Sequence, residues 1–392
     1  MSRWVKPGRL LVGCVAVAVL FASTALAAGL HWSIQSGTTT GLRNAQLVGV
    51  SCGSARSCFA VGVSVNSRKF QGPLAERWRG KSWSVQRTAI PAGAQSAELF
   101  DIACSSSTKC TATGRYTNAS KLTLALSERW NGSKWVIQRT RNAAGANRST
   151  LRGVSCPSNN WCMAVGASKG HNSGFRTLAE RWNGRSWSIQ RTPNPSTGPF
   201  GNELITVSCG STRSCIAVGD IVDNSGHVKG LVARWNGRSW SAQNVPLPAG
   251  AFFSKIVGVS CAGPSACEAV GYYSLSPSGG ALGFAESWNG TGWQLQTIPA
   301  PAGAQQTLPI DVECSSSADC TAVGEVINGR GTEVTLAEQW NGTAWQVQST
   351  PNPRGAALSL FNATSCTSGA SCVAVGSSGS STRQLPLAER YG

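Results

Sequence analysis

Fourteen of the fifteen cysteines fall into seven pairs, and the two members of every pair are six positions apart. The pairs are Cys52/Cys58, Cys104/Cys110, Cys156/Cys162, Cys209/Cys215, Cys261/Cys267, Cys314/Cys320 and Cys366/Cys372. An even number of cysteines at one fixed spacing is typical of disulfides in an exported protein. A zinc site would instead need C-x2-C spacing and four converging ligands, and the sequence suggests neither. We therefore expect one local disulfide in each repeat, no metal and no cofactor.

Three acidic residues interrupt apolar, strand-like segments and could serve in acid–base chemistry. Asp101 and Asp311 occupy the same place in the repeat, where the other copies carry Gly, Thr or Ala, and Glu325 follows a Val-Gly pair. A glycan hydrolase needs two carboxyl groups that face each other across a cleft. These residues are therefore candidate channel acids of a glycan-active hydrolase or lyase. Asp101 also has a structural interpretation, because the expected register places it opposite Thr113, with which it could form a hydrogen bond.

Basic and aromatic residues gather in the connections that differ from one repeat to the next. The candidate binding residues are Arg68, Lys69, Arg148, Lys169, His171, Arg176, Lys229 and Tyr272. Few acids share these segments, so the surface should be electropositive and attract anionic ligands. This favours an anionic or carbohydrate-type polymer, or a protein, as the partner. Nucleic acid is disfavoured because no binding motif for it is present. The alternative is a solvated loop surface, with the net charge of +17 serving solubility.

The elements that must position these residues form a repeat of 52 or 53 residues, marked by the turn Trp-x-Gly-x-x-Trp. One copy is Trp182-Asn183-Gly184-Arg185-Ser186-Trp187. Each repeat has an apolar strand ending in Cys, a second strand Cys-x-Ala-Val-Gly, and a third and a fourth strand on either side of this turn. Asn-Gly is a strong hairpin signal, because both residues tolerate positive φ. Four short strands with tight turns predict one blade of a β-propeller.

Features that recur in every repeat are expected to be structural, because each repeat solves the same packing problem. The paired indoles, such as Trp78 and Trp83, could stack on sugars, but their repetition favours packing within the sheets. A Glu recurs in the third strand, and we expect it to pair with a recurring Arg. If the cysteines face each other across a hairpin, Val154 lies opposite Ala164 and Gly153 opposite Val165.

One repeat is divided between the two ends of the chain. The first two strands occur seven times, whereas the complete Trp turn occurs six times. The chain ends on a third strand, 387–391, and residues 31–35 match a fourth strand with nothing before it. Pairing of these two segments would remove open sheet edges. The sequence therefore predicts an all-β fold, a seven-bladed β-propeller with four antiparallel strands per blade, in which the N-terminal strand closes the last blade.

Residues 31–392 resemble secreted bacterial β-propeller repeat proteins of the wider kelch-like and Asp-box class. Gly184-Arg185-Ser186-Trp187 is similar to the second half of the Asp box of sialidase-like propellers. The acid which that box requires, two residues before the Gly, is Trp182 here. The resemblance implies a propeller, and it carries no sialidase site over to this chain.

The N-terminus predicts an export signal over residues 1–28, followed by a propeller domain over 29–392. Arg3, Lys6 and Arg9 precede an apolar run, 10–26, which ends in an A-x-A cleavage site. The alternative is an uncleaved anchor, because the run is nearly long enough to span a bilayer. We expect a secreted or cell-surface monomer, in contact with a membrane only through an uncleaved signal.

Together these patterns favour an exported, non-catalytic binding or scaffold propeller that recognises an anionic or carbohydrate-type polymer, or a protein, at the cell surface. The alternative is a glycan-active hydrolase or lyase whose site lies at the central channel.

Overall fold

The computed structural model describes residues 29–37, 44–196, 198 and 200–392. The expected signal segment, 1–28, lies outside the described residues. Contacts divide the chain after Leu30, and the following description concerns the unit His31–Gly392. Within the described ranges, no helix has the length and apolar character needed to cross a membrane.

Twenty-eight strands build the described part of this unit, and each repeat contributes four that are antiparallel to their neighbours. Repeats 1 to 3 comprise β2 (Asn44–Ser54), β3 (Ser57–Val65), β4 (Gln71–Trp78), β5 (Trp83–Gln86); β6 (Ser96–Ser106), β7 (Lys109–Thr117), β8 (Thr123–Trp130), β9 (Trp135–Gln138); β10 (Arg148–Ser158), β11 (Trp161–Lys169), β12 (Arg176–Trp182), β13 (Trp187–Gln190). Repeats 4 and 5 comprise β14 (Gly201–Ser211), β15 (Ser214–Val222), β16 (Val228–Trp235), β17 (Trp240–Gln243); β18 (Phe253–Gly263), β19 (Ala266–Ser274), β20 (Leu282–Trp288), β21 (Trp293–Thr297). Repeats 6 and 7 comprise β22 (Ala304–Ser316), β23 (Asp319–Asn328), β24 (Glu333–Trp340), β25 (Trp345–Gln348); β26 (Leu358–Ser368), β27 (Ser371–Ser380), β28 (Arg383–Tyr391), β1 (Trp32–Ile34).

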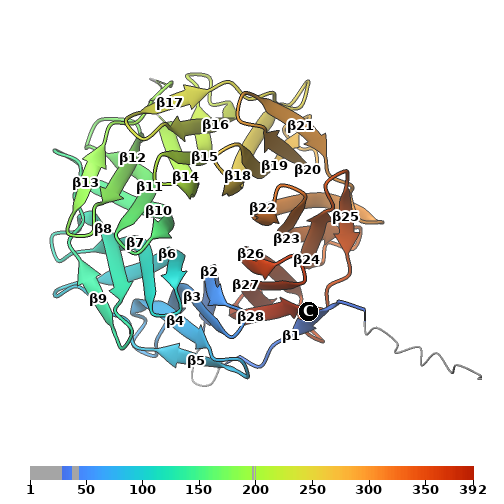
Figure 1. Ribbon diagram of the computed structural model, residues 1–392, viewed down its shortest axis with the longest axis horizontal. Helices are drawn as coiled ribbons and strands as arrows, with labels where there is room; N and C mark the ends of the chain where they lie inside the picture. Colours follow the sequence, from blue (N-terminus) through green and yellow to red (C-terminus); the bar gives the residue numbers. More distant parts are fainter. Residues whose placement is uncertain (1–28, 38–43, 197, 199) are drawn as a thin grey trace, which may run out of the picture. The chain divides into compact units, whose positions relative to one another are not determined.

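The strands of repeats 1, 4 and 5 form separate four-stranded sheets, and the remaining repeats join in pairs into two eight-stranded sheets. In each eight-stranded sheet one parallel pairing joins the two repeats. Thr123 pairs with Arg148 between repeats 2 and 3, and Glu333 pairs with Leu358 between repeats 6 and 7. The strand β1 pairs antiparallel with β28, and Trp32 lies opposite Tyr391. The first strands of successive repeats lie side by side, and β2 also contacts β26 (Figure 1).

All seven predicted disulfides are present, each joining the first strand of a repeat to its second. The register that we expected from them is confirmed, because Val154 pairs with Ala164 and Gly153 with Val165. The alternation of small and large residues has a steric reason. A Cβ on Gly153 would lie only 2.9 Å from the Cα of Thr206 in the next repeat. Glycine at this position therefore lets neighbouring first strands approach closely.

The second Cys of every pair is buried in the sheet core, with an exposed fraction between 0% and 5%. These residues are Cys58, Cys110, Cys162, Cys215, Cys267, Cys320 and Cys372. Each lies opposite the first aromatic residue of the Trp turn, a Trp in six repeats and Tyr391 in the seventh. They are the disulfide cysteines that the sequence predicted, and their burial places them in the sheet core.

A β-bulge interrupts every first strand at the same place, four residues before the first Cys. The bulged residues are Val48, Phe100, Arg152, Ile205, Val257, Ile310 and Asn362. A bulge redirects a side chain out of the regular alternation. All seven bulged residues line one cavity of about 420 Å³ between the first strands. These bulges were not predicted from the sequence.

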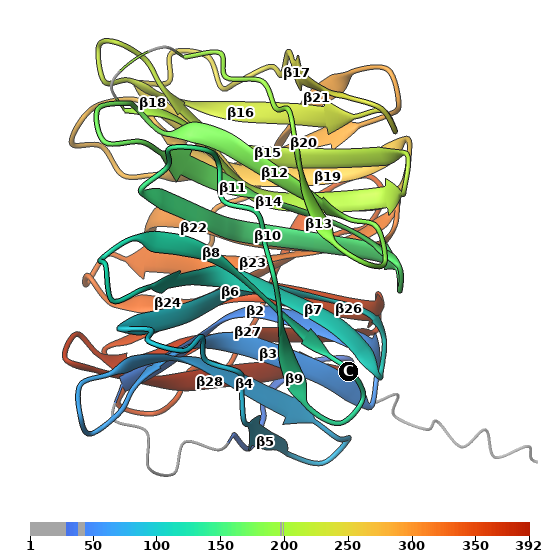
Figure 2. The same cartoon turned by 90° about the vertical axis from the view of Figure 1, so that its left-hand side faces the viewer.

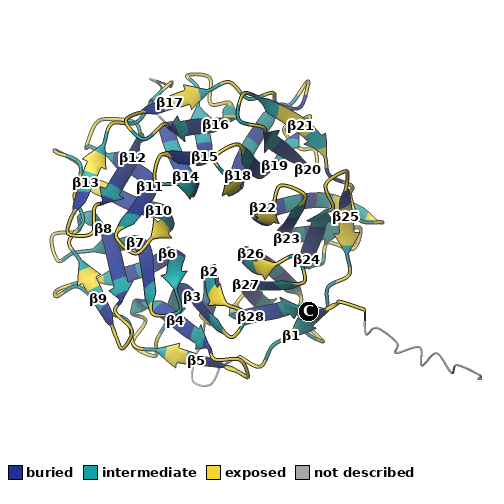
Figure 3. Cartoon of the chain, viewed as in Figure 1, coloured by how far each residue is buried: buried dark blue, intermediate teal, exposed yellow. Residues whose placement is uncertain are grey.

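The paired indoles pack inside the sheets, as their repetition predicted. Trp78 and Trp83 are both buried, and their ring centroids are 5.8 Å apart. The second strands are the most deeply buried, whereas the fourth strands expose alternate residues along the outer edge (Figure 3). Seen from the side, the connections gather at the two ends of the strands (Figure 2).

The expected pairing of the recurring Glu with the recurring Arg is not present at Glu128 or Glu180 in the described part of the chain. Glu128 and Glu180 are completely buried, and each accepts a hydrogen bond from a backbone N–H in the connection before its repeat, Ala89 and Arg141 respectively, at 2.8 Å. The Arg side chains point toward the next repeat and lie over its aromatic rings. The carboxyl is buried, and the hydrated guanidinium of a long Arg side chain is excluded from that side of the sheet. The two groups therefore do not meet.

Candidate functional site

Two of the three candidate channel acids line the same cavities. Asp101 and Asp311 border both the 420 Å³ cavity at the bulges and a second cavity of about 260 Å³ on the disulfide side. Desolvation raises the pKa of Asp101 to about 7 and that of Asp311 to about 6, and the charge of Asp311 adds to the shift at Asp101. Glu325 lines neither cavity. The three acids that we predicted together are therefore separated.

The carboxylates of Asp101 and Asp311 each accept a hydrogen bond from a backbone N–H of the following repeat. Asp101 accepts hydrogen bonds from the N–H of Val154 and of Ile102, both at 2.7 Å. Asp311 accepts one from the N–H of Thr364 at 2.9 Å. Asp101 does lie opposite Thr113, but no hydrogen bond joins their side chains, and the Thr113 hydroxyl has no partner among the described residues. The expected Asp101–Thr113 bond is thus replaced by a link between repeats.

A Ser makes the corresponding link in five repeats. It comes directly before the first Cys, and its hydroxyl accepts a hydrogen bond from the N–H of the first Cys of the next repeat. The Ser residues are Ser51, Ser155, Ser208, Ser260 and Ser365. Repeats 2 and 6 carry Ala103 and Glu313 instead, and these are the two repeats that contain Asp101 and Asp311. The Asp therefore replaces a missing Ser link, which gives both residues a structural role.

A chain of ion pairs runs beside the bulged residues across repeats 3 to 5. Arg152 pairs with Glu203, and Lys255 pairs with Asp220 at 3.2 Å. Glu203 and Asp220 lie opposite each other on β14 and β15. Burial raises the pKa of Asp220 to about 6, although Lys255 opposes that shift. The acids are thus held between two cations, which leaves the cations of this group neutralised.

Tyr272 belongs to this half-buried group and not to an exposed loop surface. It lies opposite Lys255, and burial raises the pKa of its phenol. The charges of Asp220 and Glu325 add to that shift, although Lys255 opposes it. A raised pKa disfavours the phenolate, so Tyr272 is poorly suited to act as a general base.

Four of the candidate binding residues lie in repeat 3, and two of them, Arg148 and Lys169, contact the ring of Phe175. Arg148 and Lys169 lie opposite each other on β10 and β11. The Arg148 guanidinium and the Lys169 ammonium lie 5.7 Å and 5.2 Å from the centre of the Phe175 ring. Arg176 follows Phe175 and is exposed, and the His171 ring lies 3.4 Å from the side-chain amide of Asn147. No acid pairs with these four bases among the described residues.

The other basic candidates lie elsewhere. Arg68 and Lys69 are exposed in the β3–β4 connection of repeat 1. Lys229 lies in repeat 4, where Asp223 pairs with it at 3.8 Å and with His227 at 3.6 Å. The structure therefore brings Arg148, Lys169, His171 and Arg176 together and leaves the remaining candidates outside this group.

Lys69 and Lys121 hold a backbone conformation that favours glycine. Both have φ of 62°, in matching turns of repeats 1 and 2. An Asn side chain closes each turn, and the equivalent positions in repeats 4 and 6 are Gly226 and Gly331, which also have positive φ. The left-handed conformation costs a side-chain-bearing residue about 1 kcal/mol. In both loops a lysine occupies the tip of the turn despite this cost in free energy.

Replacing Lys69 by Gly should raise the free energy of unfolding by about 0.5–1 kcal/mol, since it relieves the backbone strain and is partly offset by the greater freedom of an unfolded glycine. Lys69→Ala, which removes the same charge and keeps the strain, is the matched control and should leave the stability unchanged. Chemical denaturation measures both. Equal stability of the Gly and Ala variants would contradict a strained Lys69.

Two residues of this arrangement were not predicted from the sequence. Arg152 and Lys255 were not identified because each departs from the repeat at a single position and has no motif around it. The signal was available in the comparison of equivalent positions, where Lys255 is a cation at a place that carries Glu98 or Glu203 in two repeats and neutral residues in the other four. Among the described residues, no group of three His, Cys, Asp or Glu side chains could hold a metal ion.

Comparison with solved structures shows that this is a propeller-like repeat fold. An ulvan lyase, a polysaccharide lyase bound to -[GlcA(1-4)Rha3S]-, is 9% identical over 88% of this chain and 94% of its own, with a TM-score of 0.55. A protein of unknown function from Dyadobacter fermentans is 8% identical over 92% and 97%, with a TM-score of 0.51. Trypanosoma rangeli sialidase with 2,3-difluorosialic acid is 10% identical over 92% of this chain and 58% of its own, with a TM-score of 0.50. At these identities the likeness concerns the fold alone. No family model matches the sequence, and no curated protein does.

Proposed function

We propose that this protein is an exported, monomeric, seven-bladed β-propeller that binds an anionic polysaccharide without cleaving it. The basic group around Phe175 in repeat 3 is the binding site. The signal covers residues 1–28 and the propeller residues 29–392.

Closure into seven blades is supported by the neighbours of each first strand. Contacts run from β2 through β6, β10, β14, β18 and β22 to β26, and from β26 back to β2. The pairing of β1 with β28 supplies repeat 7 with its fourth strand. Export is supported by the seven disulfides, because such bonds persist in oxidising compartments.

The single observation that carries the binding site is the placement of two cations over one aromatic ring. Arg148 and Lys169 lie over Phe175 and have no acidic partner in the described part of the chain. A sugar ring can stack its apolar face on an aromatic side chain, while its carboxylate or sulfate group accepts hydrogen bonds from Arg and Lys. The solved polysaccharide lyase and sialidase with a similar fold are consistent with a glycan ligand.

Catalysis at the channel has less support. The Asp101 and Asp311 carboxylates are occupied by backbone N–H groups, and five of the seven bulged residues at the channel cavity are apolar. A pair of free carboxyls is what a hydrolase would need.

Retention on immobilised polygalacturonate and dextran sulfate tests the proposal. Arg148→Ala should weaken binding by about tenfold at low salt, because a hydrogen bond to a charged group contributes about 1.5 kcal/mol. Arg185→Ala is the matched control, since it removes the same charge from the exposed turn at the other end of β12. Phe175→Leu separates stacking from charge. Equal losses in Arg148→Ala and Arg185→Ala would show that only the net charge matters and would contradict this site.

A further inference from the structure

In five of the seven repeats an Arg comes directly before the first aromatic residue of the Trp turn. These residues are Arg77, Arg129, Arg181, Arg234 and Arg390. Arg129 lies 5.9 Å from the ring of Trp182 in the next repeat and donates a hydrogen bond to the carbonyl of Asn159 at 2.6 Å. Arg390 likewise donates to the carbonyl of Ala55 at 2.9 Å.

Asn159 and Ala55 occupy the same place, the third residue after the first Cys of their repeats. The turn between the first two strands thus offers a carbonyl to the guanidinium of the preceding repeat. Where the Arg donates this hydrogen bond, it links one repeat to the next.

Repeat 5 departs from this pattern at two facing positions. Ser287 replaces the Arg, and Glu268 lies opposite it on β19. In the repeats with an Arg, the residue opposite is apolar or Thr, for example Phe59 opposite Arg77 or Ile216 opposite Arg234. Repeat 5 therefore gains a carboxyl and lacks a guanidinium at two facing positions of the same pair of strands.

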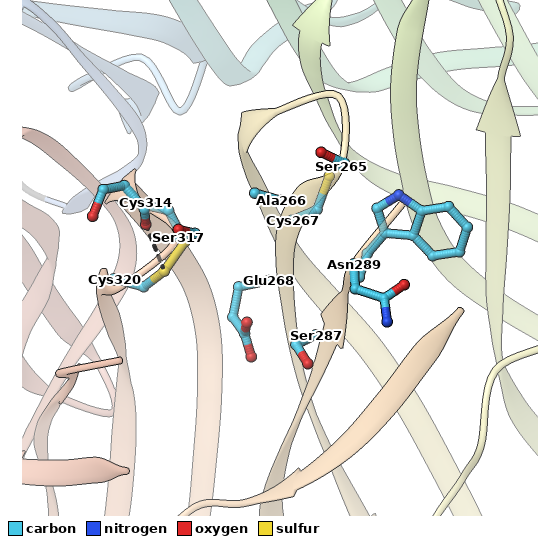
Figure 4. A pocket seen from close by; sticks show the side chains of 11 residues that line it. Ser265, Ala266, Cys267, Glu268, Ser287, Asn289, Cys314, Ser317 and Cys320 are labelled. Carbon is cyan, nitrogen blue, oxygen red and sulfur yellow. Dashed lines mark hydrogen bonds between the residues drawn. A yellow bond between two sulfur atoms is a disulfide. The ribbon is translucent and has the colours of Figure 1, made fainter. Parts of the chain in front are cut away.

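A cavity of about 230 Å³ fills the place of the missing Arg, between repeats 5 and 6. Glu268, Ser287 and the disulfide Cys314–Cys320 line it, together with Ser317, which matches Asn159 and Ala55 in the repeat. Figure 4 shows the Glu268 carboxyl beside Ser287, with the disulfide on its other side. Glu268 is only 5% exposed, and its Oε1 atom has no hydrogen-bond partner among the described residues.

We propose that this cavity binds an alkylguanidinium group supplied from outside the chain. The group would occupy the space that the recurring Arg fills elsewhere, with Glu268 as the counter-ion and the Ser317 carbonyl as an acceptor. The volume corresponds to about seven or eight waters of the bulk liquid, which suits a short alkylguanidinium. Such a site favours a guanidinium over the ammonium of Lys, because the planar guanidinium binds a carboxylate with two parallel hydrogen bonds.

Binding should be coupled to the release of a proton. Burial, and to a smaller extent the charge of Glu286 on the neighbouring strand β20, raises the pKa of Glu268 to about 9. The residues that line the cavity from repeat 6 are serines and disulfide-bonded cysteines and add no titrating charge. A cation needs the ionised carboxylate, so its apparent affinity should rise about tenfold per pH unit below pH 9.

Calorimetric titration of the full chain with agmatine tests the site. The dissociation constant at pH 8.5 should be about 100-fold lower than at pH 6.5, and Glu268→Gln should abolish both the binding and its pH dependence. Ser287→Arg should supply the guanidinium internally, raise the melting temperature and prevent agmatine binding. Because Ser287→Arg could fold poorly, Ser287→Met provides a second variant that fills the space without a charge and should also prevent binding.

The controls distinguish the site from nonspecific binding and identify the source of the ligand. Arg234→Ser opens the equivalent space opposite Ile216, without a carboxyl, and should not bind agmatine. Binding of a Gly-Arg-Gly peptide, but not of its citrulline analogue, would indicate an arginine side chain of a partner, and binding of agmatine alone a small molecule. Binding that persists unchanged in Glu268→Gln, or that is absent in the wild type, would overturn the proposal.

Discussion

The free energy of unfolding should fall by several kcal/mol as the pH rises from 5.5 to 8.5. The cause is the recurring Glu of the third strand. Burial raises the pKa values of Glu128, Glu180, Glu286, Glu338 and Glu389 to about 8 each, and a backbone N–H opposes the shift at Glu128 and Glu180. An unfolded Glu has a pKa of about 4.3.

The sign follows from the protons bound in each state. Between about pH 4.5 and pH 8 the folded protein keeps these carboxyls protonated, while the unfolded chain has released the protons. The stabilisation is therefore complete below about pH 4.5 and is lost as the pH rises toward about 8. Each group contributes a slope of at most about 1.4 kcal/mol per pH unit. The summed slopes would exceed the stability of an ordinary domain, so partial hydration must limit the loss.

Thermal unfolding in matched ionic strength measures the effect. We expect the melting temperature to fall by about 5–10 °C between pH 5.5 and pH 8.5. Glu338→Gln keeps the shape of the side chain and removes its titration, so it should be near neutral at pH 5.5 and stabilising at pH 8.5. Glu333→Gln, at the half-exposed start of the same strand, is the control for the loss of a carboxyl outside the core and should not reproduce the stabilisation at pH 8.5. A melting temperature that rises with pH would contradict the burial of neutral carboxyls.

The local features of the fold could be predicted from the sequence, because they depend on residues close together in the chain. The cysteine spacing determined both the disulfides and the register of Val154 on Ala164. Repetition correctly predicted that Trp78 and Trp83 pack inside the sheet. These predictions succeeded because one hairpin contains all the residues concerned.

Contacts between repeats could not be predicted in the same way. The bulge that turns Arg152 into the 420 Å³ cavity has no residue type of its own, since the bulged position varies from Val48 to Arg152 to Asn362. The partner of Asp101 lies 53 positions away, in repeat 3. The recurring Glu was assigned to the recurring Arg because opposite charges on one strand suggest a pair. In the structure the Glu is buried in its own sheet, whereas the Arg contacts an aromatic ring of the next repeat. The two residues therefore do not pair.

Asp101→Gly should lower the free energy of unfolding by about 1–3 kcal/mol, because the Val154 N–H loses its acceptor. The variant gives repeat 2 the Gly that repeat 1 has at Gly49. Repeat 1, however, also has Ser51 to form the link to the next repeat, where repeat 2 has Ala103. The loss of stability should therefore come from the missing hydrogen-bond acceptor and not from the Gly itself.

Adding Ala103→Ser to Asp101→Gly should restore about 1 kcal/mol, because the new hydroxyl can accept a hydrogen bond from the Cys156 N–H as Ser155 does from Cys209. Ala103→Ser alone is the control and should change the stability little. Chemical denaturation of the four proteins in a double-mutant cycle measures the coupling. Additive effects would contradict the exchange of one link for the other. The rescued variant also tests the channel acids, because it lacks the Asp101 carboxylate in a stable fold. Glycan cleavage by the wild type that disappeared in this variant would favour catalysis at the channel over binding at repeat 3.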